Sequence, residues 1–446
     1  MPETLDETYE RVLREINKAN REHARRLLQC LTVALRPLRV EELAEVLAID
    51  FDMPSDGGIP QLNPNWRWTD QHQAVLSTCS SLIAIVDDGD SQVVQFSHFS
   101  VKEFLTSDRL ARSSVDVSLY HILLEPAHII LAQACLGILL RLDDHVDSGN
   151  VSEIPLASYA SRHFLDHAEF ENVALHIRDA MEYFFDADKS HWTIWCHVQS
   201  IEESTETDIC PLYFAALGGF FDLSEHLIWK HPEHVNASGG QRLTPLGAAL
   251  EGKHFQVAEL LYQRGAEVDG SSSYTPLYAA CDSQVLDTAR WLLDHGANVN
   301  TQSNQLWAPL HDAIDYGRFP VFQILIEHNA DIDIRTDFGK SPLHLAASSW
   351  VKGDHHIDII QLLLDHGANP NARDNDDSTP LHHSSWWEKG PGYVLRQGTV
   401  EGTRLLLKHG AIIDAEDNEG RTPLQLALEH GRHDIAACLL EHGATR

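Results

Sequence analysis

The stretch that decides the fold is SPLHLAA, residues 341–347, followed by HGANPNARD, residues 366–374. A Ser or Thr before Pro is typical of a helix start, because its oxygen caps free N–H groups and Pro tolerates the first turn. The apolar residues that follow have the spacing of one helix face. Gly367 falls where a helix ends, and the polar residues after it favour turns. This stretch therefore predicts a pair of helices followed by a turn-rich link.

The same unit recurs throughout the second half of the chain. The dipeptide Pro-Leu begins at Pro211, Pro245, Pro276, Pro309, Pro342, Pro380 and Pro423. A marker, Gly-Ala or Asn-Ala, begins at Gly265, Gly296, Asn329, Gly367, Gly410 and Gly443. The step from marker to next Pro is 11 residues once and 13 residues four times. The step from Pro to marker is 20 residues in four repeats, 25 from Pro342 and 30 from Pro380, so insertions enter at one place in the unit.

This pattern resembles the ankyrin repeat, whose unit is about 33 residues long with a T-P-L-H-x-A signature. The resemblance covers roughly residues 205–446. It implies a mainly α fold in this region, an α-solenoid of about seven repeats joined by β-hairpin loops. Each repeat is expected to bury its apolar strip against its neighbours.

A metal site is the first alternative to consider for DNDDSTPLHHSSWW, residues 374–387, because His and carboxylate side chains bind metals. However, His382 occupies the same place in its repeat as His311 and His344. The His before the marker also recurs, at His295, His328, His366, His409 and His442. We therefore expect these histidines to bond backbone groups of the loops and turns. The repeat explains most of the ligands, so we predict no metal and no cofactor, and only the aromatic residues remain unexplained.

The first part of the chain is not repetitive. Apolar spacing predicts amphipathic helices around residues 9–16 and 24–35, and VEELAEVLAI at 40–49 predicts a third. A fourth helix, QHQAVLSTCSSL, precedes LIAIV and QVVQF, which flank DDGDS as in a β-hairpin. Helices followed by a hairpin predict a winged-helix-like domain at 1–115. Residues 116–204 are expected to form a helical linker domain that leads into the repeats at 205–446.

The segments LDETYERVLREI, RPLRVEELAEVLAID and VQFSHFSVKEFL resemble the winged helix that follows the NTPase module in fungal NACHT-type STAND proteins, which are NLR-like. The resemblance implies a sensor or adaptor whose repeats recognise a ligand or partner. This chain begins about where the NTPase module would end, and it contains no GxxxxGK[ST] phosphate loop. One alternative is therefore that the chain is the C-terminal sensor part of a nucleotide-switched receptor. The sequence leaves open whether Arg446 ends the array.

The chain of 446 residues carries a formal net charge of -33, which disfavours nucleic acid and membrane partners and favours neutral or basic protein surfaces. Its seven cysteines are scattered and never form CxxC, as expected in the reducing cytoplasm, with the nucleus as an alternative. The longest apolar stretch, residues 127–142, is too short to span a bilayer and predicts a buried helix.

A DNA-binding winged helix is a weaker alternative. The helix before the hairpin has no Lys or Arg, and the tip DDGDSQ carries three acids, so both would repel phosphates. The first two helices are basic, through Arg11, Arg14, Lys18, Arg21, Arg25 and Arg26. We interpret this basic face as solvated or in contact with another domain.

Evidence for an enzyme or a small-molecule substrate is missing from the sequence. His163 and His167 stand at i and i+4, the spacing of two ligands on one helix face, but no HExxH or third ligand accompanies them. We interpret the pair as structural. No GxSxG, phosphate loop or Cys/His nucleophile signature occurs either, so the chain is expected to be non-catalytic.

The strongest candidate for a binding site is a set of aromatic residues that the repeat does not explain. They lie at loop tips, at the ends of first helices or in the longest insertion: Trp307, Tyr316, Trp350, Trp386, Trp387 and Tyr393. Trp and Tyr are enriched among interface residues that carry binding energy. About half of them are expected to fill gaps between repeats instead. The sequence thus predicts a non-catalytic protein-interaction scaffold or sensor that binds a protein on its concave ankyrin surface.

Overall fold

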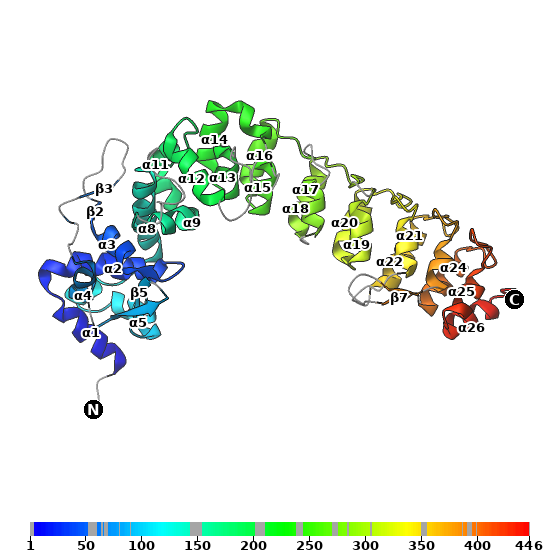
Figure 1. Ribbon diagram of the computed structural model, residues 1–446, viewed down its shortest axis with the longest axis horizontal. Coiled ribbons are helices and arrows are strands. Elements are labelled where there is room, and N and C mark those ends of the chain that lie inside the picture. Colours follow the sequence, from blue (N-terminus) through cyan, green and yellow to red (C-terminus); the bar gives the residue numbers. More distant parts are fainter. Residues whose placement is uncertain are drawn as a thin grey trace. The chain divides into compact units, whose positions relative to one another are not determined.

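The computed structural model describes residues 4–51, 60–63, 66, 70–79, 81–89, 91–142, 154–200, 210–237, 244–269, 275–282, 285–303, 306–348, 355–385, 387–389, 395–397 and 399–445. The chain forms two compact units, Met1–Gly265 and Ala266–Arg446. The first contains helices and a three-stranded sheet, and the second is built mainly from pairs of helices (Figure 1). The mainly α fold class predicted from the sequence is confirmed.

The N-terminal helices of the first unit follow the predicted apolar pattern. They are α1 (Leu5–Glu15), α2 (Arg21–Val33), α3 (Val40–Leu47) and α4 (Gln71–Cys79). Helix α1 begins at a capping box, in which Thr4 and Glu7 each bond the other's backbone N–H. Leu13, Leu27 and Leu43 are fully buried, so the predicted apolar faces form a shared core.

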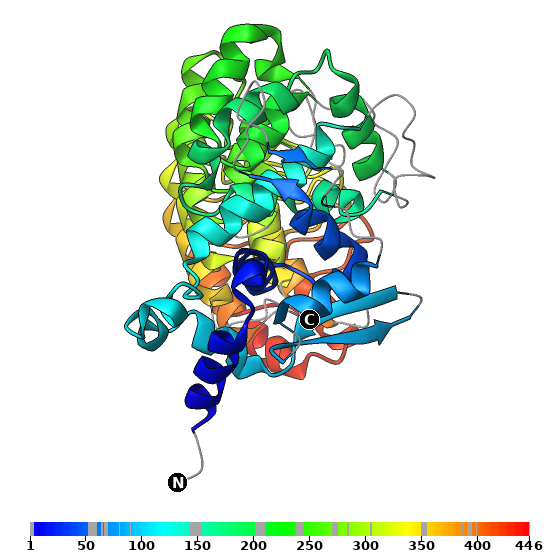
Figure 2. The same cartoon turned by 90° about the vertical axis from the view of Figure 1, so that its left-hand side faces the viewer.

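The predicted hairpin is also present. Strands β4 (Ile83–Asp88) and β5 (Ser91–Phe96) pair antiparallel and lie side by side in Figure 2. A third strand that the sequence did not predict, β1 (Leu38–Arg39), joins the other edge of β5 and gives the order β1-β5-β4. A strand of two residues has no periodicity to recognise. A second small sheet pairs β2 (Ile49–Asp50) with β3 (Gln61–Leu62).

The rest of the N-terminal half is helical. Helix α5 (Phe99–Leu105) leads into α6 (Asp108–Ala111), α7 (Val115–Ser118), α8 (Leu124–Leu139), α9 (Ala157–Ala168), α10 (Val173–His176), α11 (Arg178–Phe184) and α12 (Ser190–Ser200). The apolar stretch predicted to be buried forms most of α8, which packs against α9. Within the described ranges, no helix combines the length and apolarity needed to cross a bilayer.

Two helix pairs complete the first unit. They are α13 (Pro211–Leu217) with α14 (Phe221–Lys230), and α15 (Pro245–Glu251) with α16 (Phe255–Gln263). A short 3₁₀ turn, η4 (Pro232–Asn236), lies between the pairs. Helix α13 packs on α15 and α14 packs on α16, so the first helices form one layer and the second helices another.

The second unit repeats this arrangement. The first helices are α17 (Pro276–Asp282), α19 (Pro309–Asp315), α21 (Pro342–Ser348), α23 (Pro380–Ser385) and α25 (Pro423–Glu429). The second helices are α18 (Leu286–Asp294), α20 (Phe319–Glu327), α22 (His356–Asp365), α24 (Val400–Lys408) and α26 (His433–Glu441). Each first helix packs against the next first helix, and the pairs follow one another in a row in Figure 1. The longest insertion contains a hairpin of β6 (Trp387–Lys389) and β7 (Leu395–Gln397).

The three links that the structure describes in full, before α21, α23 and α25, are tight turns of one repeated geometry. In these turns the fourth residue has positive φ: Gly339, Asp377 and Gly420. Neighbouring turns are hydrogen-bonded, because the N–H of Asn375 donates to the Phe338 carbonyl at 3.1 Å and that of Asn418 donates to the Asp376 carbonyl at 3.0 Å. The turns therefore fix the spacing between successive repeats.

Gly339 and Gly420 give a direct test of how closely the turns approach one another. Both have φ +71°, but a Cβ at Gly339 would meet the backbone nitrogen of Asn375 at 2.9 Å, whereas a Cβ at Gly420 would meet nothing within 4 Å. Gly420→Ala should cost about 1 kcal/mol of unfolding free energy, from the left-handed backbone alone. Gly339→Ala should cost clearly more, because the next turn must move. Urea unfolding of both variants measures the difference, and equal losses would mean that the turns are not held in contact.

Candidate functional site

The histidines of the first helices hold each repeat to the following turn. In α21, Nδ1 of His344 accepts the N–H of Ser341 at 3.1 Å, while Nε2 donates to the carbonyl of Ser378 at 3.1 Å. His311 and His382 make the equivalent pair of bonds, and all three rings are fully buried. The prediction that these histidines bond backbone groups is confirmed. Both nitrogens of His382 are occupied, so this ring has no lone pair to offer a metal.

The histidines before the markers have a second, equally regular role. The Nδ1–H of each donates to the carbonyl four residues earlier, at 2.7–2.9 Å: His295 to Trp291, His328 to Ile324, His366 to Leu362, His409 to Leu405 and His442 to Cys438. Each carbonyl also accepts the backbone N–H of the same histidine, so the ring adds a second hydrogen bond at the end of the helix. The prediction that these histidines bond backbone groups is confirmed, but the acceptors lie in their own helices and not in the loops expected from the sequence.

Side chains of the turns form a further ladder between repeats. Nε2 of Gln302 donates to the carbonyl of Arg335, the guanidinium of Arg335 donates to the carbonyl of Arg373, and that of Arg373 donates to the carbonyl of Glu416. The three donors occupy the same place in successive repeats. The amide of Gln302 and the guanidinium groups of Arg335 and Arg373 therefore help to hold the turns together.

A buried polar cluster lies under the DNDD turn. His383 donates from Nε2 to Oδ2 of Asp374 at 2.7 Å, and the rings of His344 and His383 meet edge to face at 5.2 Å. Oδ1 of Asp374 accepts the N–H groups of Asp376 and Ser378 at 3.0 and 2.9 Å. The ligand atoms of the three side chains lie within 4.8 Å of one another. Because His344 already uses both nitrogens, the cluster works as a buried hydrogen-bonded pair rather than as a three-ligand site.

Burial controls the protonation of this cluster and of the equivalent histidine in an earlier repeat. It lowers the pKa of His344 to about 3 and that of His311 to about 4, because the charged ring would lose its water. For Asp374, burial works in the opposite direction, but the hydrogen bond and charge of His383 outweigh it and the pKa lies below its ordinary value. The repeats are therefore held together by neutral imidazoles.

The sequence-predicted aromatic site is only partly described. Tyr316, directly after α19, is 58% exposed, and the guanidinium of Arg318 lies 4.5 Å from its ring centre. Trp307 is half-buried, and its ring meets that of His311 edge to face at 5.7 Å. Trp307 thus packs on the buried histidine of its own repeat, while Tyr316 faces solvent.

The other four predicted residues cannot be placed with these two. Trp350, Trp386 and Tyr393 lie outside the described residues. The backbone of Trp387 belongs to β6 and pairs with Gln397. Their role in partner binding stays a prediction.

Two exposed apolar residues were missed by the sequence reasoning. Phe338 is 63% exposed at a turn tip, and Ile412 is 56% exposed after α24. In the neighbouring turns the place of Phe338 is taken by the acids Asp376 and Glu419. Comparing the turns position by position would have identified Phe338 as the residue that departs from the pattern.

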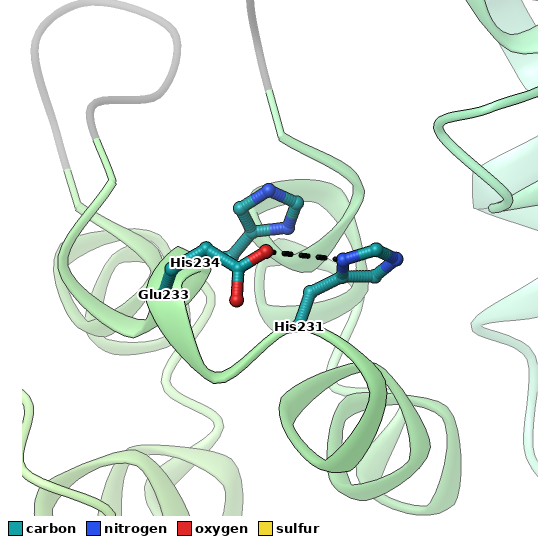
Figure 3. Close-up of side chains that lie close together, drawn as sticks. All are labelled: His231, Glu233 and His234. Atoms are coloured by element: carbon teal, nitrogen blue, oxygen red, sulfur yellow. Dashed lines mark hydrogen bonds and ion pairs between the residues drawn. The ribbon is translucent and has the colours of Figure 1, made fainter.

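A smaller cluster follows α14, where His231, Glu233 and His234 gather on one turn (Figure 3). Nδ1 of His231 lies 3.2 Å from Oε1 of Glu233, and the two rings stack at 4.9 Å. Zinc ligands stand about 3.3 Å apart when Zn–N is about 2.0 Å, and these atoms lie within 4.8 Å of one another. As it stands, the geometry is that of a surface hydrogen-bonded pair that could close around a divalent cation.

His163 and His167, which the sequence places at i and i+4, lie in two different environments. His167 is fully buried, with Nε2 at 2.7 Å from the Tyr159 hydroxyl and Nδ1 at 2.9 Å from Nδ1 of His128. Burial lowers its pKa to about 3. His163 is instead near the surface, 3.2 Å from Asp166. The two rings do not share a ligand position, which agrees with a structural role.

The comparisons with known proteins fit this geometry. The model of the family "Ankyrin repeats (3 copies)" matches residues 212–303, 269–336, 310–394 and 391–445, and these matches together cover more than half of the chain. The chain belongs to the ankyrin-repeat family. A second family model, "GPI inositol-deacylase, winged helix domain", matches residues 10–117 of this ankyrin-repeat protein. The winged-helix prediction is thereby confirmed.

Relatives of this ankyrin-repeat protein include "Azaphilone pigments biosynthesis cluster protein L" of Monascus ruber, with 29% identity over 60% of each chain. "Ankyrin repeat protein nuc-2" of Neurospora crassa is 28% identical over 31% of this chain and 13% of its own length. "B-cell lymphoma 3 protein homolog" of mouse is 33% identical over 24% of each chain. The matches thus cover 60% or less of each of these relatives.

The buried histidines predict an acid-sensitive fold. Their pKa is about 6.5 when unfolded and about 4 or 3 when folded. Between these values the unfolded chain binds protons that the folded chain does not. The stability that they contribute is therefore complete above pH 6.5 and falls as the pH drops toward 4, by up to about 1.4 kcal/mol per pH unit for each ring.

The measurement is urea unfolding of the parent chain and His311→Gln at several pH values from 7 to 4.5. The variant should be less stable at pH 7 and should lose less stability on acidification. His433→Gln, which replaces an exposed histidine, is the control and should follow the parent. Parallel slopes for the parent and His311→Gln would show that the buried ring does not drive the acid response.

Proposed function

We propose that this ankyrin-repeat protein is a non-catalytic interaction scaffold or sensor module, which binds a protein partner across the turn tips and first-helix ends of its repeats. Ankyrin repeats support a protein-interaction role in general. In ankyrin proteins this face is concave and holds partners. The observation that carries the proposal is the exposure of two aromatic rings of the repeats, Tyr316 at 58% and Phe338 at 63%.

The exposed surface of these two rings does not contribute to packing within the repeats. Phe338 offers only its backbone to the neighbouring turn, through the bond from Asn375. Tyr316 contacts Arg318 through one face of its ring. Burial of apolar surface stabilises association by roughly 25 cal/mol per Å², and aromatic residues dominate the energy of most interfaces. A partner that covers these rings would gain this free energy without disturbing the stack.

The charge around the rings favours a neutral or basic partner surface. Exposed acids at the turn tips include Asp337, Asp376, Asp377 and Glu419. The arginines of the same turns are committed to backbone carbonyls in the ladder. Glu419 is paired with Arg421 at 2.9 Å, so it is Asp337, Asp376 and Asp377 that would attract cationic side chains of a partner, which raises association rates and excludes acidic partners.

A non-catalytic role agrees with the state of the cysteines. All seven are buried and not disulfide-bonded. Burial raises the pKa of the Cys30, Cys79 and Cys196 thiols to about 12, and raises that of Cys135 further. A thiol needs its thiolate form to act as a nucleophile. Seven buried thiols also suit a reducing cytoplasm, where we propose the protein acts.

A second function is favoured by the winged-helix match at residues 10–117. Under this alternative, the chain is the C-terminal sensor part of a nucleotide-switched NACHT/STAND receptor. Sequencing the gene directly upstream of the Met1 codon tests it, because an in-frame Walker motif is required.

A DNA-binding role is less favoured, since Asp87 and Asp88 end the wing strand β4 and helix α4 has no Lys or Arg. It predicts a gel shift that weakens steeply with salt.

Removing the two exposed rings should reduce partner capture without unfolding the chain. We expect the full chain with Tyr316→Ala and Phe338→Ala to lose one or more proteins that the parent retains in affinity purification with quantitative mass spectrometry. A loss of about tenfold or more is reasonable, since a hot-spot residue contributes about 2 kcal/mol or more. The Tm should change little, because both rings are exposed.

The matched control is Trp229→Ala, an aromatic residue 78% exposed on helix α14. It should retain every partner that the parent binds. The same comparison with Trp386→Ala and Trp387→Ala tests the site predicted from the sequence. A drop in Tm equal to the loss of capture would assign the substituted rings to folding, and an unchanged set of partners would reject the proposed face.

A further inference from the structure

A basic cavity of about 620 Å³ lies in the first unit, beside helix α2. One wall consists of Lys18, Arg21, Arg25 and Gln29, which recur at helical spacing along one side of η1 and α2. The opposite wall runs from the end of α7 to the start of α8 and includes His121. In a chain with a net charge of -33, this local concentration of positive charge is unusual.

The six basic residues of the first helices divide into two groups. Arg11, Arg14 and Arg26 pair with Glu15, Glu10 and Glu22 on the same helices. Arg11 and Arg14 lie on the solvated face predicted from the sequence, whereas Arg26 is buried. Lys18, Arg21 and Arg25 form no such pair with the described residues, and they line the cavity.

Two observations show that this wall is incomplete as it stands. The Nε atoms of Arg21 and Arg25 are buried and, within the described ranges, have no hydrogen-bond partner. Gln29 is only 2% exposed, and its Oε1 atom also lacks a partner among the described residues. A buried polar atom without a partner costs about 1–3 kcal/mol. The wall therefore presents two donors, from Arg21 and Arg25, and one acceptor, from Gln29, that have no partner among the described residues.

We propose that this cavity binds a small organic phosphate that carries hydroxyl groups. The guanidinium groups of Arg21 and Arg25 would hold the phosphate oxygens, since Arg presents paired N–H donors that match phosphate geometry. Lys18 adds a further positive charge to the same wall. Oε1 of Gln29 requires a donor, which a ligand hydroxyl supplies while the phosphate oxygens accept from the two arginines.

The size and charge of the cavity agree with a small ligand. Small-molecule sites enclose about 300–1,000 Å³. The acid that lines it, Glu22, is bonded to Arg26 at 3.2 Å. Asp116 lies 4.0 Å from Arg14 and also lies in the field of Arg21. Three cations therefore face one lining carboxylate, which is already paired.

A phosphate of a nucleic acid backbone would use the same cations, but the acids Asp87 and Asp88 on the wing strand of the same domain disfavour a long polyanion. The site is also independent of the proposed partner face, because it is built only from the winged-helix domain and the helices that follow it.

The test is isothermal titration calorimetry of the full chain in phosphate-free buffer, with glucose 6-phosphate, inorganic phosphate, glucose and a short DNA duplex as probes. We expect glucose 6-phosphate to bind more tightly than inorganic phosphate, and glucose and DNA not to bind. The double variant Arg21→Gln with Arg25→Gln should weaken binding of both phosphates by about tenfold or more. Arg112→Gln, which removes a charge from a side chain 83% exposed outside the cavity, should bind like the parent.

Gln29→Met tests recognition of the ligand hydroxyl separately from recognition of the phosphate. It should abolish the advantage of glucose 6-phosphate over inorganic phosphate while leaving phosphate binding intact. It should also raise the Tm of the free protein, because it removes a buried acceptor without a partner. The proposal is overturned if neither phosphate binds at millimolar concentration, if binding survives the double arginine variant, or if DNA binds more tightly than glucose 6-phosphate.

Discussion

The repeats depend on one constraint: a helix pair of this size cannot bury its own apolar strip, so every pair must be held against the next at a fixed spacing. The fully buried imidazoles of His311, His344 and His382 impose that spacing, because each ring bonds its own helix start through one nitrogen and a later turn through the other. A neutral imidazole is suited to this task, since it offers one donor and one acceptor in a rigid ring. The depressed pKa of these rings is a consequence of that role.

This constraint explains why the pattern at DNDDSTPLHHSSWW first suggests a metal site. The repeat period alone predicted the role of His382, because its position recurs. The pairing of His383 with Asp374 could not be predicted in the same way, since His383 has no counterpart at its position in the neighbouring repeats. Contacts that recur once per repeat can be derived from spacing, whereas a contact made once depends on how the chain folds back on itself.

The same distinction separates the predicted from the unpredicted elements of the N-terminal half. Helices α1 to α4 and the β4–β5 hairpin follow from apolar spacing and turn residues, and the winged-helix match confirms them. The two-residue strand β1 does not, because Leu38 joins the sheet only through its pairing with Val94, far along the chain. The basic helices show the limit most clearly. Their charges were visible in the sequence. Some of these arginines pair with glutamates of the same helix, and others line a cavity formed with residues about 100 positions later. Spacing along a helix could not distinguish the two groups.

Charge has opposite uses in the repeats and in the winged-helix domain. In the repeats, Arg335 and Arg373 bond carbonyls of the next turn and share the surface with the exposed acids of the turn tips. In the winged-helix domain, Arg21 and Arg25 keep buried Nε atoms that have no partner among the described residues, at a cost that folding alone does not require. Apolar residues of similar size could fill the same wall at lower cost. Polar groups held at such a cost are typical of positions where a ligand, rather than the protein, completes the hydrogen bonds. An acidic surface outside and a cationic cavity within would therefore allow one chain to attract a basic protein and retain a small anion without competition between the two.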